Sequence, residues 1–448
     1  MVNLTPLFQH VEENREKYLE YAKRLISVPS VSTYGSGLEE CADLVAEMLE
    51  NHGFRVEKFS NPEGGGPILL GTINYEAHAT LMFYNHYDVQ PAEPLEKWTT
   101  PPFTPVVRNG KLYGRGAADN KGNIAARLAA VDALLSTLGE LPVNLKFLIE
   151  GGEEVGSPGL EKFVRENRDK LFADGCIWEY GYVSRSGSPV IYLGQKGMLY
   201  VEMEIQGPAS DLHSSWGAVV ENPAWRLVQA LSTMRGPDGR VTVDGFYDDV
   251  VYEGEELLEK LDISEFSPPH KLLKSAEKNP LRQLFLEPTI NLNGLYAGYI
   301  GPGSKTIIPA KASAKLDIRL VPRQTPEKIK QLLLQHLEKN GLTDIKLHIH
   351  QAYPAARTSP DNFLPKLVAD TAATAYGKPS IIIPSGAASG PMYVITDILE
   401  TPCVSTGCGY YGSSPHGPDE NIRLTDFTAN IKHIALIMLN FKNYLYTG

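Results

Sequence analysis

The residues best suited to chemistry in this sequence are histidines and carboxylates that follow short apolar runs. His86 and Asp88 come directly after the apolar residues 80–84. Residues two apart on a strand share a face, so both side chains can point the same way at the strand end. A histidine that binds a metal usually has its other ring nitrogen held by a carboxylate or carbonyl, which Asp88 could supply. The pair predicts a supported metal ligand, or a solvated loop histidine beside a turn aspartate.

A glycine-rich stretch places another carboxylate just before a helical pattern. Residues 114–122 read Gly-Arg-Gly-Ala-Ala-Asp-Asn-Lys-Gly, which lacks the order of a phosphate-binding loop and does not fit a dinucleotide fingerprint. The glycines let the backbone crowd against a site and leave Asp119 projecting ahead of a helix that begins near Gly122. The alternative is that Asp119 only caps this helix.

Two adjacent acids, Glu153 and Glu154, follow the apolar run 143–149 at a strand end flanked by glycines. Neighbouring side chains on a strand point apart, so one acid can bind a metal ion while the other faces the metal-bound water. A general base needs that second position, because it must not be consumed as a ligand. An acidic surface loop is the alternative for this pair.

Two further candidates come later in the chain. Glu179 follows the short apolar run 176–178, and His416 lies among glycines and prolines in a loop that could fix its imidazole. Taken alone, His416 could also be a solvated loop histidine. Two dications would balance three carboxylates and one bridging hydroxide, and such a site activates a water and polarises a carbonyl. Without ions, clustered carboxylates would repel one another. The complete candidate set is His86, Asp119, Glu154, Glu179 and His416.

The elements that must position these residues fall into three segments. Residues 1–194 alternate apolar runs with helical patterns, which predicts an α/β sheet covered by helices, with ligands at the carboxyl ends of its strands. Residues 195–354 have the order of a small split βαβ domain, with a helical insertion at 236–286. Residues 355–448 return to the first pattern. We therefore predict a discontinuous α/β catalytic domain with a mixed sheet, interrupted by an inserted α+β domain.

Composition excludes several classes of protein. The 448 residues include 42 basic and 53 acidic side chains, which give a net charge of −11. Without a basic block, such a chain is unsuited to bind nucleic acid or an anionic membrane. No apolar stretch approaches the roughly 18 residues that cross a bilayer, the N-terminus lacks a secretory pattern, and four cysteines cannot form a disulfide framework for a chain of this size. We expect a cytoplasmic protein without nucleic-acid or membrane partners.

Several ordered motifs resemble those of the co-catalytic zinc peptidases and deacylases. Residues 85–90 read Asn-His-Tyr-Asp-Val-Gln, residues 113–116 read Tyr-Gly-Arg-Gly, and residues 119–122 read Asp-Asn-Lys-Gly. This family includes carnosine and nonspecific dipeptidases, aminoacylase and succinyl-diaminopimelate desuccinylase, and the motifs are most similar to its dipeptidase branch. The resemblance covers nearly the whole chain. It implies a split catalytic domain and an inserted ferredoxin-like domain that serves as lid and dimerisation domain.

The resemblance also implies how the candidates divide between two metal ions. Asp119 would bridge the ions, and the family often has a cis peptide after this residue. Asp88 would orient a histidine ligand, and Glu153 would be the general base. The ligands of one ion would be His86, Asp119 and Glu179, and those of the other would be Asp119, Glu154 and His416.

The inserted domain and the last segment carry further residues that resemble the family's substrate contacts. His213, within residues 210–215, would reach the partner subunit's active site and stabilise the oxyanion. Thr306 and Arg319 resemble substrate-binding residues, and a guanidinium suits a substrate carboxylate. Ser389 matches the serine of an Arg-Glu-Gly-Gly-Ser stretch in the dipeptidase branch. Residues 385–389 here read Ser-Gly-Ala-Ala-Ser, so the arginine is absent and substrate anchoring differs.

The predicted function is hydrolysis of the amide bond of dipeptides or similar small peptides by a homodimer. A metal-bridging hydroxide would attack, with Glu153 as general base. Two alternatives stay open: a deacylase or desuccinylase that acts on N-acyl amino acids, and a catalytically silent dimer that binds peptides. Zinc is the expected ion, although imidazole and carboxylate ligands also accept manganese and cobalt.

Overall fold

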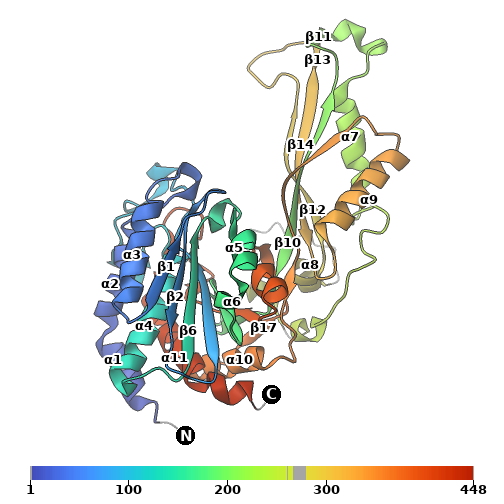
Figure 1. Ribbon diagram of the computed structural model, residues 1–448. Helices are drawn as coiled ribbons and strands as arrows, with labels where there is room; N and C mark the ends of the chain where they lie inside the picture. Colours follow the sequence, from blue (N-terminus) through green and yellow to red (C-terminus); the bar gives the residue numbers. More distant parts are fainter. Residues whose placement is uncertain (1–2, 260, 266–278, 447–448) are drawn as a thin grey trace.

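The protein consists of a broad body and a long arm that rises from it (Figure 1). The structure is a computed structural model that describes residues 3–259, 261–265 and 279–446. The body combines the two ends of the chain: helix α1 (Thr5–Glu13) packs against helix α11 (Leu424–Leu445). The middle of the chain forms the arm, which confirms the predicted α/β fold with an inserted α+β domain. The residue bounds 1–194, 195–354 and 355–448 stay a prediction.

Within the described residues, a mixed sheet of ten strands forms the centre of the body. Strand β3 (Thr80–His86) pairs in parallel with β6 (Asn144–Gly151) and β7 (Gly175–Trp178), so their carboxyl ends meet at one edge. The strand order is β1 (Arg55–Phe59), β2 (Gly66–Ile73), β6, β3, β7, β19 (Cys403–Ser405), β9 (Pro189–Tyr192), β8 (Tyr182–Val183) and β20 (Gly409–Tyr410), with β17 (Ile381–Ile383) beside β9.

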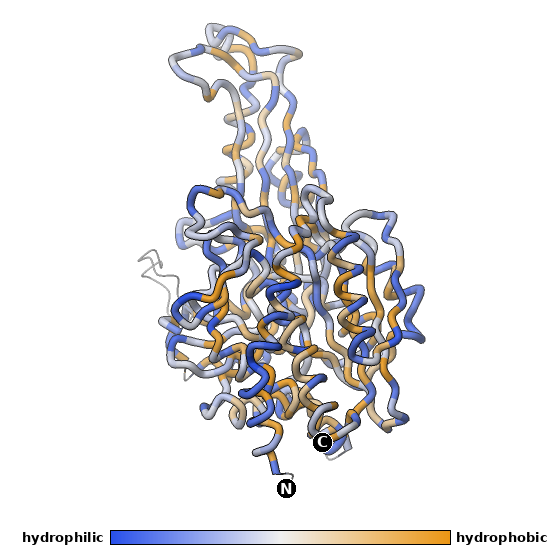
Figure 2. Tube along the Cα trace, turned by 90° about the vertical axis from the view of Figure 1, so that its left-hand side faces the viewer, coloured by the Kyte–Doolittle hydropathy of each residue, from blue (hydrophilic) through white to orange (hydrophobic). Residues whose placement is uncertain are grey.

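Both faces of this sheet are buried, because successive residues of β3 enter different cores. Leu81 and Phe83 pack into the larger core and Met82 and Tyr84 into the smaller one. The larger core lies under α1, α2 (Arg15–Ile26), α3 (Leu38–Glu50), α4 (Lys121–Leu138), α10 (Phe363–Tyr376) and α11. The smaller core lies under α5 (Leu160–Glu166), the loop after α6 (Arg168–Leu171), and the π-helical turn Val394–Ile398. Figure 2 shows hydrophobic residues along the segments inside the body.

Helix α4 is buried on nearly every side, because it packs between β3 and helices α1, α2 and α11. A helix that is apolar all round can be stable only in such a position. In the part of the chain that the structure describes, no helix has both the length and the apolar character needed to span a membrane.

A small antiparallel sheet joins the loop that carries Asp119 to the C-terminal segment. Strand β5 (Lys111–Tyr113) pairs with β21 (Asn421–Arg423) on one side and β4 (Val106–Arg108) on the other. Single 3₁₀ turns occur at Ser32–Tyr34, Leu95–Lys97 and Glu153–Val155.

The arm is an antiparallel sheet covered on one face by two helices. Its strand order is β12 (Thr289–Ala297), β14 (Lys311–Leu320), β10 (Gly194–Gln206) and β15 (Lys346–Tyr353). Helices α7 (Pro223–Met234) and α9 (Pro326–Lys339) contribute apolar residues to its core. Strand β10 begins beside β16 (Ala356–Arg357) and β18 (Gly386–Ser389) and continues into the arm, while β11 (Leu212–His213), β13 (Ile307–Ile308) and the 3₁₀ turn Ser214–Ala218 form the tip (Figure 1).

The helical insertion predicted at 236–286 is largely wrong. The described residues there contain the 3₁₀ turns Glu255–Leu258 and Ile263–Glu265 and the short helix α8 (Pro280–Leu286), and residues 260 and 266–278 lie outside the described part. Gly239, Gly245 and Gly254 have positive φ angles, which a helix does not accommodate. The charged composition of this segment is typical of an exposed helix, and it therefore led to the wrong prediction.

Candidate metal centre

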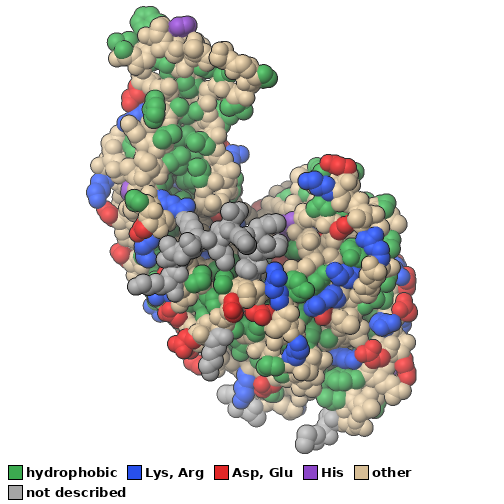
Figure 3. All heavy atoms as spheres, turned by 180° about the vertical axis from the view of Figure 1, so that it is seen from behind, with side chains coloured by type: hydrophobic (Ala, Val, Ile, Leu, Met, Phe, Trp, Pro, Cys, Tyr) green, Lys and Arg blue, Asp and Glu red, His purple; other side chains and the backbone are tan. Residues whose placement is uncertain are grey.

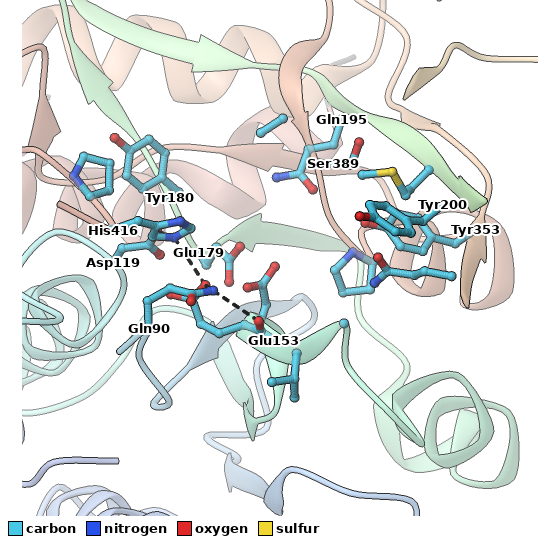
Figure 4. A pocket seen from close by; sticks show the side chains of 18 of the residues that line it. Gln90, Asp119, Glu153, Glu179, Tyr180, Gln195, Tyr200, Tyr353, Ser389 and His416 are labelled. Atoms are coloured by element: carbon cyan, nitrogen blue, oxygen red, sulfur yellow. Dashed lines mark hydrogen bonds and ion pairs between the residues drawn. The ribbon is translucent and has the colours of Figure 1, made fainter. Parts of the chain in front are cut away.

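The predicted ligands converge at the edge of the sheet where β3, β6 and β7 end. A cavity of about 1,000 Å³ opens there between the body and the base of the arm (Figure 4). His86 is the last residue of β3, and Glu179 follows β7 directly. Asp119 precedes α4, and Glu153 and Glu154 form the turn after β6. Parallel strands thus bring together residues that are distant in sequence.

His86, Glu153 and Glu179 form a first group of possible metal ligands, whose ligand atoms all lie within 4.8 Å of one another. The Nε2 atom of His86 is 3.4 Å from Oε2 of Glu179. His86 is fully buried and Glu179 nearly so. Glu153, the predicted general base, therefore lies close enough to the ligand pair to act on a group bound there.

Asp119, Glu154 and His416 form a second group, also within 4.8 Å of one another. The Nε2 atom of His416 is 3.2 Å from both Oδ2 of Asp119 and Oε2 of Glu154. The other oxygen of Asp119, Oδ1, is 3.1 Å from Nε2 of His86. Asp119 thus presents one oxygen to each group, which is the arrangement that a bridging ligand requires.

The charges of this cluster fit metal cations. Burial raises the pKa of Glu179 to about 8, and the charge of Asp119 adds to this rise although His86 opposes it. Burial and the neighbouring Glu179 raise the pKa of the Glu153 carboxyl well above its usual value. Oε1 of Glu154 and Oε2 of Glu179 are buried and accept no hydrogen bond. Buried carboxylate oxygens without donors need a cation nearby, so the residues present suit divalent metal ions.

Asp88 holds both the histidine and the acidic turn in place. Its carboxylate accepts hydrogen bonds from the backbone N–H groups of Glu153 (3.2 Å) and Glu154 (3.1 Å). Its backbone carbonyl oxygen is 3.0 Å from Nδ1 of His86, and its carboxylate oxygen Oδ1 is 3.3 Å away. A proton on Nδ1 leaves Nε2 free to bind a metal. Asp88 therefore positions both His86 and the turn that carries Glu153 and Glu154, whereas the sequence analysis predicted only its contact with His86.

Glu420 is a supporting residue that the sequence analysis missed. Its Oε2 accepts hydrogen bonds from Nη1 of Arg115 (2.8 Å) and the backbone N–H of Gly116 (2.9 Å). Its Oε1 accepts from the backbone N–H groups of Ala118 (2.8 Å) and Asp119 (3.0 Å). One buried carboxylate thus fixes the backbone of the loop that carries the bridging acid.

Only weak sequence signals could have identified these supports. Glu420 lies four residues after His416, but its partners are about three hundred residues away in the chain. Gln90 closes the motif that begins at Asn85, and its Nε2 donates to Oε2 of Glu154 at 2.9 Å. His416 has a φ of +60°, a left-handed conformation that is uncommon for residues other than glycine and that the sequence analysis did not predict.

The predicted substrate-binding residues divide into two places. Arg319 and Ser389 both line the cavity, and Nη1 of Arg319 donates to Oγ of Ser389 at 2.8 Å. His213 and Thr306 are exposed and lie at the tip of the arm, outside the cavity of their own chain, where the backbone N–H of Ser214 donates to the carbonyl of Thr306. The label β11, which marks the strand of His213, stands at this tip in Figure 1.

Comparisons with known proteins agree with this geometry. Residues 82–440 match the sequence model of peptidase family M20/M25/M40. A Cys-Gly metallodipeptidase of Schizosaccharomyces pombe is 33% identical over 371 residues, which cover 75% of this chain and 76% of that protein. An M20 family metallo-carboxypeptidase of Sulfolobus solfataricus has a similar structure, with a TM-score of 0.89, 39% identity, and coverage of 96% of this chain and 99% of that one. For human carnosine dipeptidase 1 the TM-score is 0.84 and the identity 26%, with 99% of both chains covered.

Removal of metal is expected to destabilise the protein increasingly as the pH rises. Folding raises the pKa of Glu179 to about 8 and that of His416 to about 10, the latter through hydrogen bonds to Asp119 and Glu154. Groups with raised pKa values stabilise the fold below their unfolded pKa and lose this contribution as the pH rises through the folded value. Bound cations replace these protons.

The gap in Tm between metal-loaded and chelator-treated protein should therefore widen from about pH 6 to about pH 9. Thermal unfolding followed by circular dichroism, with metal content measured on the same samples, checks this expectation. A gap that narrows with pH would contradict the proposed clustering of charge.

Substitution Glu420→Gln is expected to weaken metal binding about 10–100-fold, the range found for residues that support ligands. The amide NH₂ of glutamine would face backbone N–H groups that now donate to a carboxylate oxygen, so the Asp119 loop would shift. Competition with a chromophoric chelator measures the affinity. Glu96→Gln, at an exposed position, is the matched control and should bind metal normally. Equal affinity in the two variants would remove Glu420 from this role.

Proposed function

Because this chain belongs to peptidase family M20/M25/M40 and its relatives include a Cys-Gly metallodipeptidase and Beta-Ala-His dipeptidases, we propose that it hydrolyses dipeptides or similar small peptides at a pair of metal ions. The observation that carries this proposal is the convergence of two histidines and four carboxylates at the carboxyl edge of the sheet. We propose that His86, Asp119 and Glu179 hold one ion, and that Asp119, Glu154 and His416 hold the other. Zinc is the expected ion, and the ligand types also accept manganese or cobalt.

Bound ions of this kind polarise a substrate carbonyl and lower the pKa of water. Glu153 is the proposed general base, which takes a proton from the attacking water and later delivers it to the leaving amine. The position of Glu153 supports this role, because its carboxylate lines the cavity next to His86 and Glu179.

Arg319 is the proposed anchor of the substrate's C-terminal carboxylate. Its guanidinium reaches the cavity from β14 and is fixed by Oγ of Ser389 and, through Nε, by Oδ1 of Asp317 at 3.1 Å. Oγ of Ser389 in turn donates to the carbonyl of Gly197 at 3.0 Å. A guanidinium held in one orientation suits a planar carboxylate. Ser389 thus positions Arg319, although the stretch 385–389 around Ser389 lacks the arginine expected from the dipeptidase branch.

The arm is the proposed dimer interface, and His213 and Thr306 would act in the partner's cavity. Neither residue reaches the cavity of its own chain, yet both are exposed side by side at the tip. Apolar side chains gather along the arm (Figure 3), including Trp225 on α7 and Leu295 on the edge strand β12, which are 68% and 52% exposed. A second copy of the chain would cover this face and pair with the edge strand.

Two alternatives are tested by the choice of substrates. A panel of dipeptides and N-acyl amino acids separates a dipeptidase from a deacylase or desuccinylase, whose substrates carry the same C-terminal carboxylate for Arg319. The silent peptide-binding dimer is disfavoured, because four proposed ligands and Glu153 line one cavity and His86 lies directly beside Glu153 and Glu179. Absence of hydrolysis for every amide, with metal content verified, would favour it.

Substitution Glu153→Gln is expected to lower kcat by about 10²–10⁴-fold, the usual contribution of a general base, with metal content unchanged. The glutamine keeps the size of the side chain but cannot take up the proton. Glu154→Gln is the matched comparison, because the neighbouring acid is a proposed ligand and its loss should release metal. Steady-state kinetics and metal analysis of both variants check this. Loss of metal in Glu153→Gln would make this residue a ligand instead.

Mixing two inactive variants should restore activity if His213 acts across the dimer. Neither His213→Ala nor Glu153→Gln alone forms a complete site. A mixed dimer contains one site with Glu153 from one subunit and His213 from the other. Random exchange makes about half of the dimers mixed, so about a quarter of all sites would be complete. Recovery of roughly that share of wild-type kcat is expected, and no recovery despite verified subunit exchange would contradict action in trans.

A further inference from the structure

A second cavity, of about 280 Å³, opens beside the metal centre and has no part in the roles described so far. Its volume is close to the lower end of the roughly 300–1,000 Å³ of ligand pockets. Every side chain among the described residues that line it is uncharged, and burial raises the pKa of Tyr182 to about 12, so that phenol stays neutral. This aromatic pocket is lined by Tyr180, Tyr182, Tyr192, Gln195, Leu284, Phe285, Gly386, Ala387, Ala388 and Ser405.

The aromatic pocket adjoins the main cavity. Tyr180, Gln195 and Ala388 line both spaces. Tyr180 follows the proposed ligand Glu179 directly, so the boundary between the two spaces lies next to the metal centre. Figure 4 shows the amide of Gln195 above the gap between Glu179, Glu153 and Ser389.

Gln195 leaves a hydrogen-bond acceptor unused at this boundary. Its Oε1 is buried and accepts no hydrogen bond. An acceptor that is buried without a donor is unfavourable, so a rotation of the amide that brought this oxygen to a ligand N–H group would be stabilised. The N–H groups of a peptide's first residue can supply such a donor.

Strand β18 joins the aromatic pocket to the carboxylate anchor. Gly386, Ala387 and Ala388 line the pocket, and Ser389, at the end of the strand, holds Arg319. Strand residues are about 3.3 Å apart, so the pocket lining begins roughly 3 Å and ends roughly 10 Å from Ser389. An extended dipeptide spans roughly 7 Å, which falls within this range. A substrate whose C-terminal carboxylate binds Arg319 can therefore place its first residue at the pocket.

We propose that the aromatic pocket receives an apolar or aromatic side chain of the residue that precedes the scissile bond. This inference rests on the proposed function, because Arg319 sets the direction of the substrate. An apolar side chain loses contact with water favourably among the aromatic rings. A charged side chain finds no counter-charge in the described lining and loses its hydration without compensation. The substrate class is thus dipeptides that begin with residues such as leucine or phenylalanine.

The first test compares kcat/KM of the metal-loaded enzyme for Leu-Ala, Phe-Ala, Gly-Ala, Asp-Ala and Lys-Ala. Leu-Ala and Phe-Ala should exceed Gly-Ala about tenfold or more, since apolar pockets discriminate by this order, and should exceed Asp-Ala and Lys-Ala by a larger factor. If Gly-Ala and Lys-Ala are cleaved as well as Leu-Ala, the pocket inference fails while the proposed function stands. If no dipeptide is cleaved, the proposed function itself fails.

A charge placed in the pocket provides a second test. Leu284 on α8 lines the pocket and is 36% exposed, so Leu284→Glu is tolerated by the fold. The new carboxylate should lower the ratio of kcat/KM for Leu-Ala over Lys-Ala about tenfold or more. Leu138→Glu, at an exposed leucine at the end of α4, is the matched control and should leave this ratio unchanged. Equal ratios in the two variants would overturn the proposal.

Discussion

Mutual repulsion of buried carboxylates is the constraint on which the rest of this structure depends. Asp119, Glu153, Glu154 and Glu179 crowd at one edge of the sheet, and two of their buried oxygens, Oε1 of Glu154 and Oε2 of Glu179, lack hydrogen-bond donors. Such a cluster is stable only if cations or protons neutralise it. The raised pKa of Glu179 shows that burial makes the charged form costly without a cation. The scaffold must therefore hold the acids together against their own repulsion.

Two further acids, Asp88 and Glu420, hold the cluster together, because their carboxylates bind the backbone N–H groups of the segments that carry the clustered acids. Asp88 accepts hydrogen bonds from the turn of Glu153 and Glu154, and Glu420 accepts them from the loop of Asp119. Charge-assisted bonds to backbone N–H groups are strong, and they fix the position of a loop without occupying its ligand atoms. Because Glu420 comes from the last segment, the metal centre needs both parts of the discontinuous body.

Strand periodicity was sufficient to place His86 at the end of a strand, although it left open whether the histidine binds a metal. The pairs that hold the site, by contrast, depend on loops about three hundred residues apart, and local patterns carry no information on such contacts. The left-handed backbone of His416 likewise follows from its tertiary surroundings. At residues 236–286 a charged composition suggested helices, but glycines with positive φ form turns there. Local sequence pattern thus predicted the strands and helices of the body, whereas the residues that hold the site in place depend on contacts between distant parts of the chain.

The body and the base of the arm contribute different kinds of residue to the site. The body supplies the acids and histidines, each fixed at a strand end or by a buried carboxylate. The base of the arm supplies Arg319 and Gln195, and β10 runs from the cavity into the arm as one continuous strand. A change in the angle of the arm would therefore move the substrate contacts while the metal ligands stayed in place. The aromatic pocket, in contrast, is lined by body residues such as Tyr182 on β8 and Tyr192 on β9, so it would stay with the metal centre while Arg319 moved with the arm.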